Sequence, residues 1–175
     1  MTTPGPPSPL LDAPRPGRRP ATSDQGPHRQ LDQQAPPALW GELVAFARAM
    51  EGVEEGHSQV SPADSRALFL TDLPEQRSPE TNLAPGRRLE PVHLHGVDDT
   101  SVHLVLPADR GARVTALGWA EPHGHAEHGT EWMVDGPRDR AELDVVLQLI
   151  QEALDFARGP AADHPWGDAR PDTYR

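Results

Sequence analysis

Two short stretches in the middle of the chain alternate apolar residues with histidine, and this alternation is the strongest constraint on the fold. Every second position is apolar in both, as read from Val92-His93-Leu94-His95 and Ser101-Val102-His103-Leu104. A side-chain period of two indicates β-strands, and the Gly- and Asp-rich residues 96–100 between them are typical of a hairpin loop. The two stretches therefore predict a β-hairpin with one apolar face and one histidine-bearing face.

The position of the loop predicts which residues face each other across this hairpin. With the loop centred on Asp98, the expected pairs are Val92 with Leu104, His93 with His103, Leu94 with Val102, and His95 with Ser101. A slip of one residue would mix the two faces, so burial of the apolar side chains should enforce this register. Opposed Cβ atoms lie about 5 Å apart, and residues two apart on one strand about 7 Å apart. Three imidazoles are therefore predicted to converge.

The hairpin belongs to a predicted domain over residues 38–158 in which short strands alternate with amphipathic helices. Helices are expected at 39–50, 107–117 and 139–158, and further strands at 54–60, 66–71, 119–121 and 131–135. This order predicts an α+β fold, with a mostly antiparallel sheet and helices packed on one face. The helix-free face would then carry the polar side chains, including the imidazoles.

The two ends of the chain have a different composition from this domain. Residues 1–37 contain ten prolines among Ser, Gln, Gly and Arg, with few apolar residues to offset the entropy of ordering. They are predicted to form a disordered, partly polyproline-like extension. Residues 159–175 begin with Gly-Pro and are predicted to form a C-terminal tail.

Charge and composition exclude several classes of function. All 16 basic residues are arginine, and 27 acidic residues give a net charge of -11, which opposes binding to nucleic acid. The absence of cysteine excludes thiolate and disulfide chemistry, and the absence of lysine excludes a Schiff-base mechanism. No apolar stretch approaches the ~20 residues of a membrane span, and no signal peptide is recognisable. We therefore expect a cytoplasmic protein that binds neither nucleic acid nor membranes.

The histidines are the main candidates for chemistry, because six of the nine lie between His93 and His128. One interpretation is a metal site, in which His93, His95 and His103 bind Zn²⁺ or Fe²⁺. A second interpretation is a small-molecule pocket in which imidazoles accept or donate protons or hydrogen bonds. A third is a polar surface without function.

A second group of candidate residues follows the helix at 107–117. Trp119, Glu121 and His123 point to one side of an extended segment, so they would offer a stacking wall beside a carboxylate and an imidazole. Alternatively, Trp119 is a core residue at a helix–strand junction. His125 and His128 lie in the loop that follows and are further candidates for a metal shell.

Several motifs occur in the order and spacing of the luciferase-domain family, across roughly residues 40–158. They are Gly52-Val53-Glu54-Glu55-Gly56, His93-Leu94-His95, Ser101-Val102-His103-Leu104, Gly118-Trp119-Ala120-Glu121-Pro122-His123 and Gly136-Pro137-Arg138-Asp139. The chain therefore resembles this family, which includes the fungal luciferases and is unrelated to the flavin-dependent bacterial luciferases.

The resemblance implies an oxidation without a cofactor, since fungal luciferases oxidise a hydroxylated pyrone, 3-hydroxyhispidin, with O₂. By the same resemblance we expect a small-molecule-binding protein, an oxygenase acting on a hydroxylated aromatic or enolic compound. The expected catalytic residues are His93, His103, His123 and Glu121. The expected substrate-binding residues are His95, Ser101 and Trp119. Two alternatives stay open: a Zn- or Fe-binding protein or metalloenzyme, and a non-catalytic interaction module whose proline-rich arm engages a partner.

Overall fold

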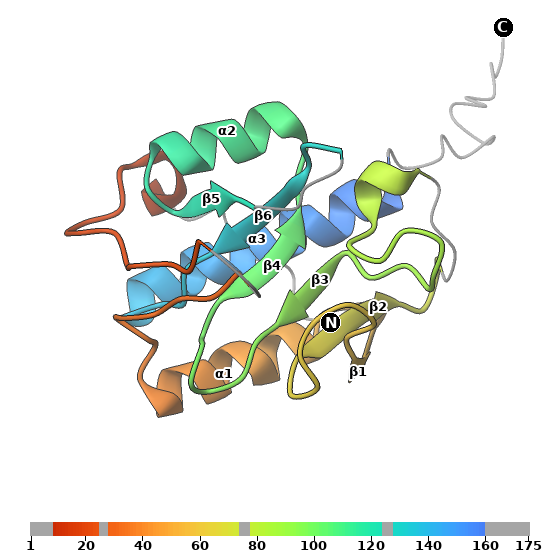
Figure 1. Ribbon diagram of the computed structural model, residues 1–175, viewed down its shortest axis with the longest axis horizontal. Helices are drawn as coiled ribbons and strands as arrows, with labels where there is room; N and C mark the ends of the chain where they lie inside the picture. The colour runs from red at the N-terminus through yellow and green to blue at the C-terminus, as the bar shows by residue number, and fades with distance from the viewer. Residues whose placement is uncertain (1–8, 25–27, 74–77, 124–127, 160–175) are drawn as a thin grey trace, which may run out of the picture.

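A single antiparallel sheet forms the centre of the computed structural model, which describes residues 9–24, 28–73, 78–123 and 128–159. Its six strands lie in the order β1-β2-β3-β4-β6-β5, and each neighbouring pair is antiparallel (Figure 1). The strands are β1 (Val53–His57), β2 (Arg66–Leu70), β3 (Val92–Leu94), β4 (Val102–Val105), β5 (Ala120–Pro122) and β6 (Glu131–Val134). The predicted antiparallel α+β arrangement is confirmed.

Three helices cover the sheet, and two of them form its main apolar contact. They are α1 (Pro37–Arg48), α2 (Ala108–Ala116) and α3 (Arg140–Arg158), with short 3-10 turns η1 (Pro9–Asp12) and η2 (Pro79–Thr81). Helices α1 and α3 contact each other, and α3 packs against β3 and β4, whereas α2 packs against β5 (Figure 1). Helix α3 begins after Asp139, whose carboxylate accepts a hydrogen bond from the Glu142 amide at 2.9 Å.

The register of the β3–β4 hairpin is the predicted one. Val92 pairs with Leu104, His93 with His103, and Leu94 with Val102. The four apolar side chains in these pairs are at most 1% exposed and belong to the same buried cluster as the inner face of α3. Because side chains alternate along a strand, this burial places the histidines on the opposite face of the sheet.

The N-terminal segment differs from the expectation of a disordered extension over residues 1–37. Residues 9–24 and 28–36 lie against the domain: Leu11 and Gln30 are each 1% exposed. The Gln30 amide donates to Asp99 Oδ1 at 2.8 Å, and the Ala35 amide donates to Thr100 Oγ1 at 2.7 Å. Hydrogen bonds from the backbone and from polar side chains hold this segment on the domain. A count of apolar residues cannot predict such bonds.

Arg15 is the main anchor of this segment. Its side chain is 3% exposed, and its guanidinium donates to Asp135 Oδ2 at 2.9 Å and to Glu142 Oε2 at 2.8 Å. A third bond reaches the Gly136 carbonyl at 2.8 Å. Arg15 therefore binds two buried carboxylates that lie more than a hundred positions away in the sequence, and Glu142 is also paired with the neighbouring Arg138.

Beyond Gly159, the predicted C-terminal tail lies outside the described residues. Within the described part of the chain, every helix is too short or too polar to span a lipid bilayer.

Replacing Arg15 with alanine should strongly destabilise the protein, because it leaves the buried Asp135 carboxylate without its cation and takes one of two arginines from Glu142. We expect a loss of about 3 to 5 kcal/mol in the free energy of unfolding, measured by urea denaturation at pH 7. Arg18 of the same segment is the matched control. It pairs with Asp32 at the surface, so Arg18→Ala should cost less than about 1 kcal/mol. Equal effects of the two substitutions would contradict the anchoring role.

Two helical glycines should respond to alanine in opposite directions. A Cβ at Gly111 of α2 would lie 1.8 Å from the indole ring of Trp132, so Gly111→Ala should destabilise the protein by about 1 to 3 kcal/mol. A Cβ at Gly41 of α1 would meet no atom within 4 Å, so Gly41→Ala should stabilise it by up to about 1 kcal/mol. Thermal unfolding of both variants measures the difference, and a stabilised Gly111→Ala would contradict this packing of α2 on β6.

Candidate functional site

One row of side chains crosses the whole sheet on the face opposite α1 and α3, and imidazoles stand at its centre. From β1 to β5 the paired residues are Gly56, Ala67, His93, His103, Met133 and Glu121. The two residues on the β1 side are small, and the ring of Phe69 covers Gly56: a Cβ at this glycine would lie 2.8 Å from that ring. This pairing makes His93 and His103 direct neighbours.

The structure brings the three imidazoles of the hairpin into one stack. The ring centroids of His95 and His103 are 4.4 Å apart, those of His93 and His103 are 4.9 Å apart, and those of His93 and His95 are 5.4 Å apart. All three residues are between 3% and 5% exposed. They are therefore an interior cluster and not a polar surface.

Two further imidazoles border this stack. The ring of His123, which follows β5, lies 4.9 Å from that of His103. The ring of His28 lies 5.3 Å from that of His123, and the His28 carbonyl accepts a hydrogen bond from His103 Nε2 at 3.1 Å. His28 comes from the N-terminal segment, so sequence analysis missed it. Its contribution depends on the docking of that segment, for which the local sequence carries no signal.

A carboxylate contacts each of the two imidazoles at the end of the β3 stretch, His93 and His95. Glu90 Oε1 lies 3.0 Å from His93 Nδ1, and Asp99 Oδ2 lies 2.5 Å from His95 Nδ1. An ionised carboxylate only accepts hydrogen bonds, so Nδ1 of each imidazole carries a proton, and in the neutral form of the ring the lone pair is on Nε2. Sequence analysis did not select either carboxylate, although both lie within four positions of the histidine they contact.

Other hydrogen bonds hold these two carboxylates in place. Glu90 accepts from the Ser58 hydroxyl at 2.6 Å and from the Gln59 amide at 2.8 Å. Asp99 accepts from the Ser101 hydroxyl at 2.9 Å, in addition to the Gln30 amide. Ser101 was expected to bind substrate. It is instead buried, and its hydroxyl holds the carboxylate that contacts His95.

Burial and charge set the protonation state of the cluster. Burial opposes ionisation of Glu90, but hydrogen bonds from His93 and Ser58 outweigh it and lower the pKa of this carboxyl. Burial lowers the pKa of His93. Burial and the neighbouring imidazoles together lower the pKa of His103 well below its usual value. At neutral pH His93 and His103 are thus neutral, and the carboxylate of Glu90 beside His93 is ionised.

The edge of the cluster near β5 is more accessible than its centre. The side chain of His123 is 18% exposed, and its Nδ1 lies 3.7 Å from Glu131 Oε2. The side chain of Glu121 is 30% exposed and contacts His28 Nε2 at 2.5 Å, and this contact lowers the pKa of Glu121. Of the predicted catalytic residues, His93 and His103 thus form the buried centre, and His123 and Glu121 form the edge.

Trp119 does not join this cluster. It is 1% exposed within the hydrophobic core, and its indole Nε1 donates to the Ala13 carbonyl at 2.9 Å. This position differs from the expected stacking wall and fits the alternative of a core residue at a helix–strand junction. In the following loop, His128 is exposed, and His125 lies outside the described residues.

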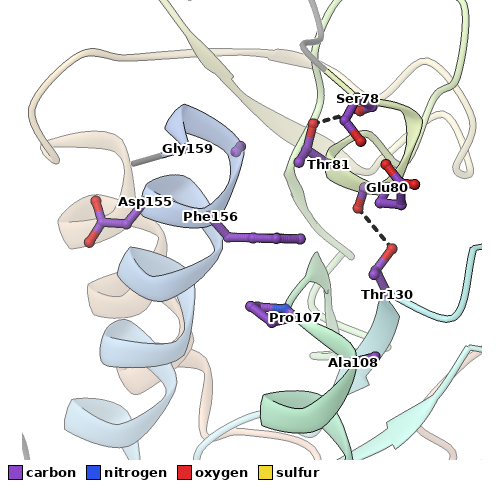
Figure 2. A pocket seen from close by; sticks show the side chains of 10 residues that line it. Ser78, Glu80, Thr81, Pro107, Ala108, Thr130, Asp155, Phe156 and Gly159 are labelled. Atoms are coloured by element: carbon purple, nitrogen blue, oxygen red, sulfur yellow. Dashed lines mark hydrogen bonds between the residues drawn. The ribbon is translucent and has the colours of Figure 1, made fainter. Parts of the chain in front are cut away.

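A cavity of about 650 Å³ lies between the end of α3, the start of α2 and η2 (Figure 2). Phe156 points into it from α3, and the Thr130 hydroxyl donates to the Glu80 carbonyl across it at 2.8 Å. A smaller cavity of about 350 Å³ borders Trp119 and Arg138. Neither cavity is lined by a histidine, so neither is the pocket expected between the hairpin and residues 119–128.

Comparisons with known proteins agree with the predicted resemblance. Residues 88–153 match the family model described as Luciferase domain. The chain is 28% identical over 162 residues to luciferases of Armillaria ostoyae and Armillaria gallica, covering 82% of this chain and 60% of each relative. It is 32% identical over 73 residues to a luciferase of Neonothopanus nambi, covering 38% of this chain and 27% of that protein. The chain thus spans about 60% of the length of the Armillaria luciferases. No solved structure matches it.

Burial of the stack should protect its imidazoles from a histidine-modifying reagent. With diethyl pyrocarbonate at pH 7, the exposed His57 and His128 should react first. His93, His95 and His103 should react about tenfold or more slowly, because the reagent needs local opening to reach them. Peptide mass spectrometry measures each rate. Similar rates for all five residues would contradict the buried cluster, since neutral imidazoles are the reactive form and only burial can slow them.

Proposed function

This chain carries a luciferase domain, and from that premise we propose that it oxidises a small hydroxylated aromatic or enolic compound with O₂ at the imidazole cluster. The observation that carries the proposal is the convergence of five imidazoles on one face of the sheet. A buried imidazole that stays neutral at neutral pH can accept a proton from an acidic enol. Removal of that proton is the step that makes such a compound reactive toward O₂.

We assign His123 as the proton acceptor. Its side chain is more exposed than those of the buried stack, at 18% against 5% for His93 and 4% for His95. Nδ1 of His123 lies 3.7 Å from Glu131 Oε2, and we assign Nε2 as the atom that meets the substrate. The carboxylate then stabilises the imidazolium that forms when the proton arrives.

The oxidation that follows needs no reagent other than O₂. The enol proton moves to His123, and the electron-rich substrate anion remains. An electron pair of that anion forms a carbon–oxygen bond with O₂, which is reduced to a peroxide. The peroxide takes the proton back from His123, so one substrate and one O₂ give one hydroperoxide. His103, at 4.9 Å from the ring of His123, would line the site on its buried side.

Glu121 and His28 are assigned a positioning role at the same edge. Glu121 contacts His28 Nε2, and the ring of His28 packs against that of His123. The N-terminal segment would therefore complete the wall of the site opposite the sheet. A substrate that reaches His123 must pass this edge, because the centre of the cluster is closed.

Oxygen uptake by the purified full chain tests the proposal. A panel of hydroxypyrones and catechols is supplied, and O₂ consumption and light emission are recorded. We expect uptake with at least one compound, and a fall of about 100-fold or more in kcat for His123→Ala, because the proton acceptor is lost.

His57→Ala is the matched control for this experiment. His57 is an exposed histidine on β1 of the same sheet, and the rate should not change when it is replaced. No oxygen uptake with any compound of the panel, or a full rate in His123→Ala, would refute the assignment.

A further inference from the structure

We propose that His93, His95 and His103 form a binding site for one divalent first-row transition-metal ion. One ring nitrogen of each histidine lies within 4.8 Å of those of the other two, and all three residues are buried. Neutral imidazole nitrogen is a preferred ligand of zinc, iron, cobalt and copper. The site goes beyond the proposed oxidation and can be tested with no substrate present.

The Nε2 atom of His93 is the observation that points to a ligand. The side chain is 5% exposed, and its Nδ1 is held by Glu90. Its Nε2 is buried and has no hydrogen-bond partner among the described residues. A buried polar atom without a partner costs free energy, and natural structures rarely keep one. A metal ion satisfies such a lone pair directly.

The carboxylates of Glu90 and Asp99 provide the support that metal-bound histidines usually have. A ligating imidazole commonly donates its second N–H to a carboxylate, which fixes the tautomer and orients the ring. His93 and His95 both show this contact through Nδ1. The lone pair of His95 is on Nε2, which lies 2.9 Å from the Ser61 hydroxyl, and that hydroxyl can rotate away.

His103 completes the set through its other ring nitrogen. Its Nε2 lies 3.1 Å from the His28 carbonyl oxygen, which only accepts hydrogen bonds. The proton of a neutral His103 is therefore on Nε2, and its lone pair is on Nδ1. In each of the three imidazoles, one ring nitrogen thus donates its proton to a fixed acceptor. The other ring nitrogen carries the lone pair that would bind the metal ion.

The charge around the cluster also suits a divalent cation. Glu90 and Asp99 are 0% and 3% exposed. Each carboxylate contacts one imidazole directly, so two negative charges lie next to the cluster. Arg29, whose side chain is half exposed, also contacts Asp99, at 3.2 Å. An ion bound by three neutral imidazoles would be balanced by these two carboxylates. The chain has no cysteine, so soft thiolate ligands do not compete for the ion.

Metal titration of the full chain, purified without a histidine tag and stripped with a chelator, tests this site. Calorimetry with Zn²⁺ and the visible spectrum with Co²⁺ should both show one equivalent bound. His93→Ala and His103→Ala each remove a ligand and should weaken binding about 100-fold or more. Glu90→Gln keeps the shape of the side chain but weakens its hydrogen bond to His93, so a loss of about 10- to 100-fold is expected. His57→Ala, the surface control, should bind as the wild type does.

A wild-type chain that binds neither ion stoichiometrically would overturn the proposal, and so would unchanged affinity in folded His93→Ala. If the alanine variants do not fold, the wild type and Glu90→Gln still decide the question: Zn²⁺ should raise the Tm of the wild type by more than that of Glu90→Gln. Equal shifts would overturn the site. Oxygen uptake without metal binding would refute this site alone, whereas metal binding without oxygen uptake would refute the proposed oxidation alone.

Discussion

The site depends on the pairing of β3 with β4. Val92, Leu94, Val102 and Leu104 of these two strands are buried in the core beside α3, and alternation then places His93, His95 and His103 together on the other face. A slip of one residue would carry the imidazoles into the core and the apolar side chains to the histidine face. The hydrophobic core therefore fixes the site, although no core residue takes part in its chemistry.

The second requirement is a set of contacts that come from outside the hairpin. Glu90 and Asp99 turn two imidazoles so that Nδ1 is occupied and Nε2 is left for a ligand or a proton. The N-terminal segment covers His103 through the His28 carbonyl and supports Asp99 through the Gln30 amide. Because Arg15 anchors this segment on Asp135 and Glu142, one buried ion network outside the cluster contributes to the closure of the site.

The hairpin could be predicted from the sequence because its signal is local. Alternation within a few residues gave both the register and the convergence of the three imidazoles. The packing of residues 9–24 and 28–36 could not be predicted in this way. It depends on Arg15 meeting two carboxylates far along the chain, and a proline-rich composition hides such a contact. His28 was missed for the same reason. Trp119 was selected where no site residue lies. Its residue type suggested a stacking wall for a ligand, but its side chain is buried in the core.

The tautomers of His93 and His95 test the account most directly, because the proposed metal site requires that the lone pair of each imidazole is on Nε2. Long-range proton–nitrogen NMR of the metal-free chain at neutral pH reports which ring nitrogen carries the proton. The account predicts a protonated Nδ1 and an unprotonated Nε2 in both residues. A proton on Nε2, or doubly protonated rings, would show that the carboxylates do not hold these imidazoles as described and would contradict the account.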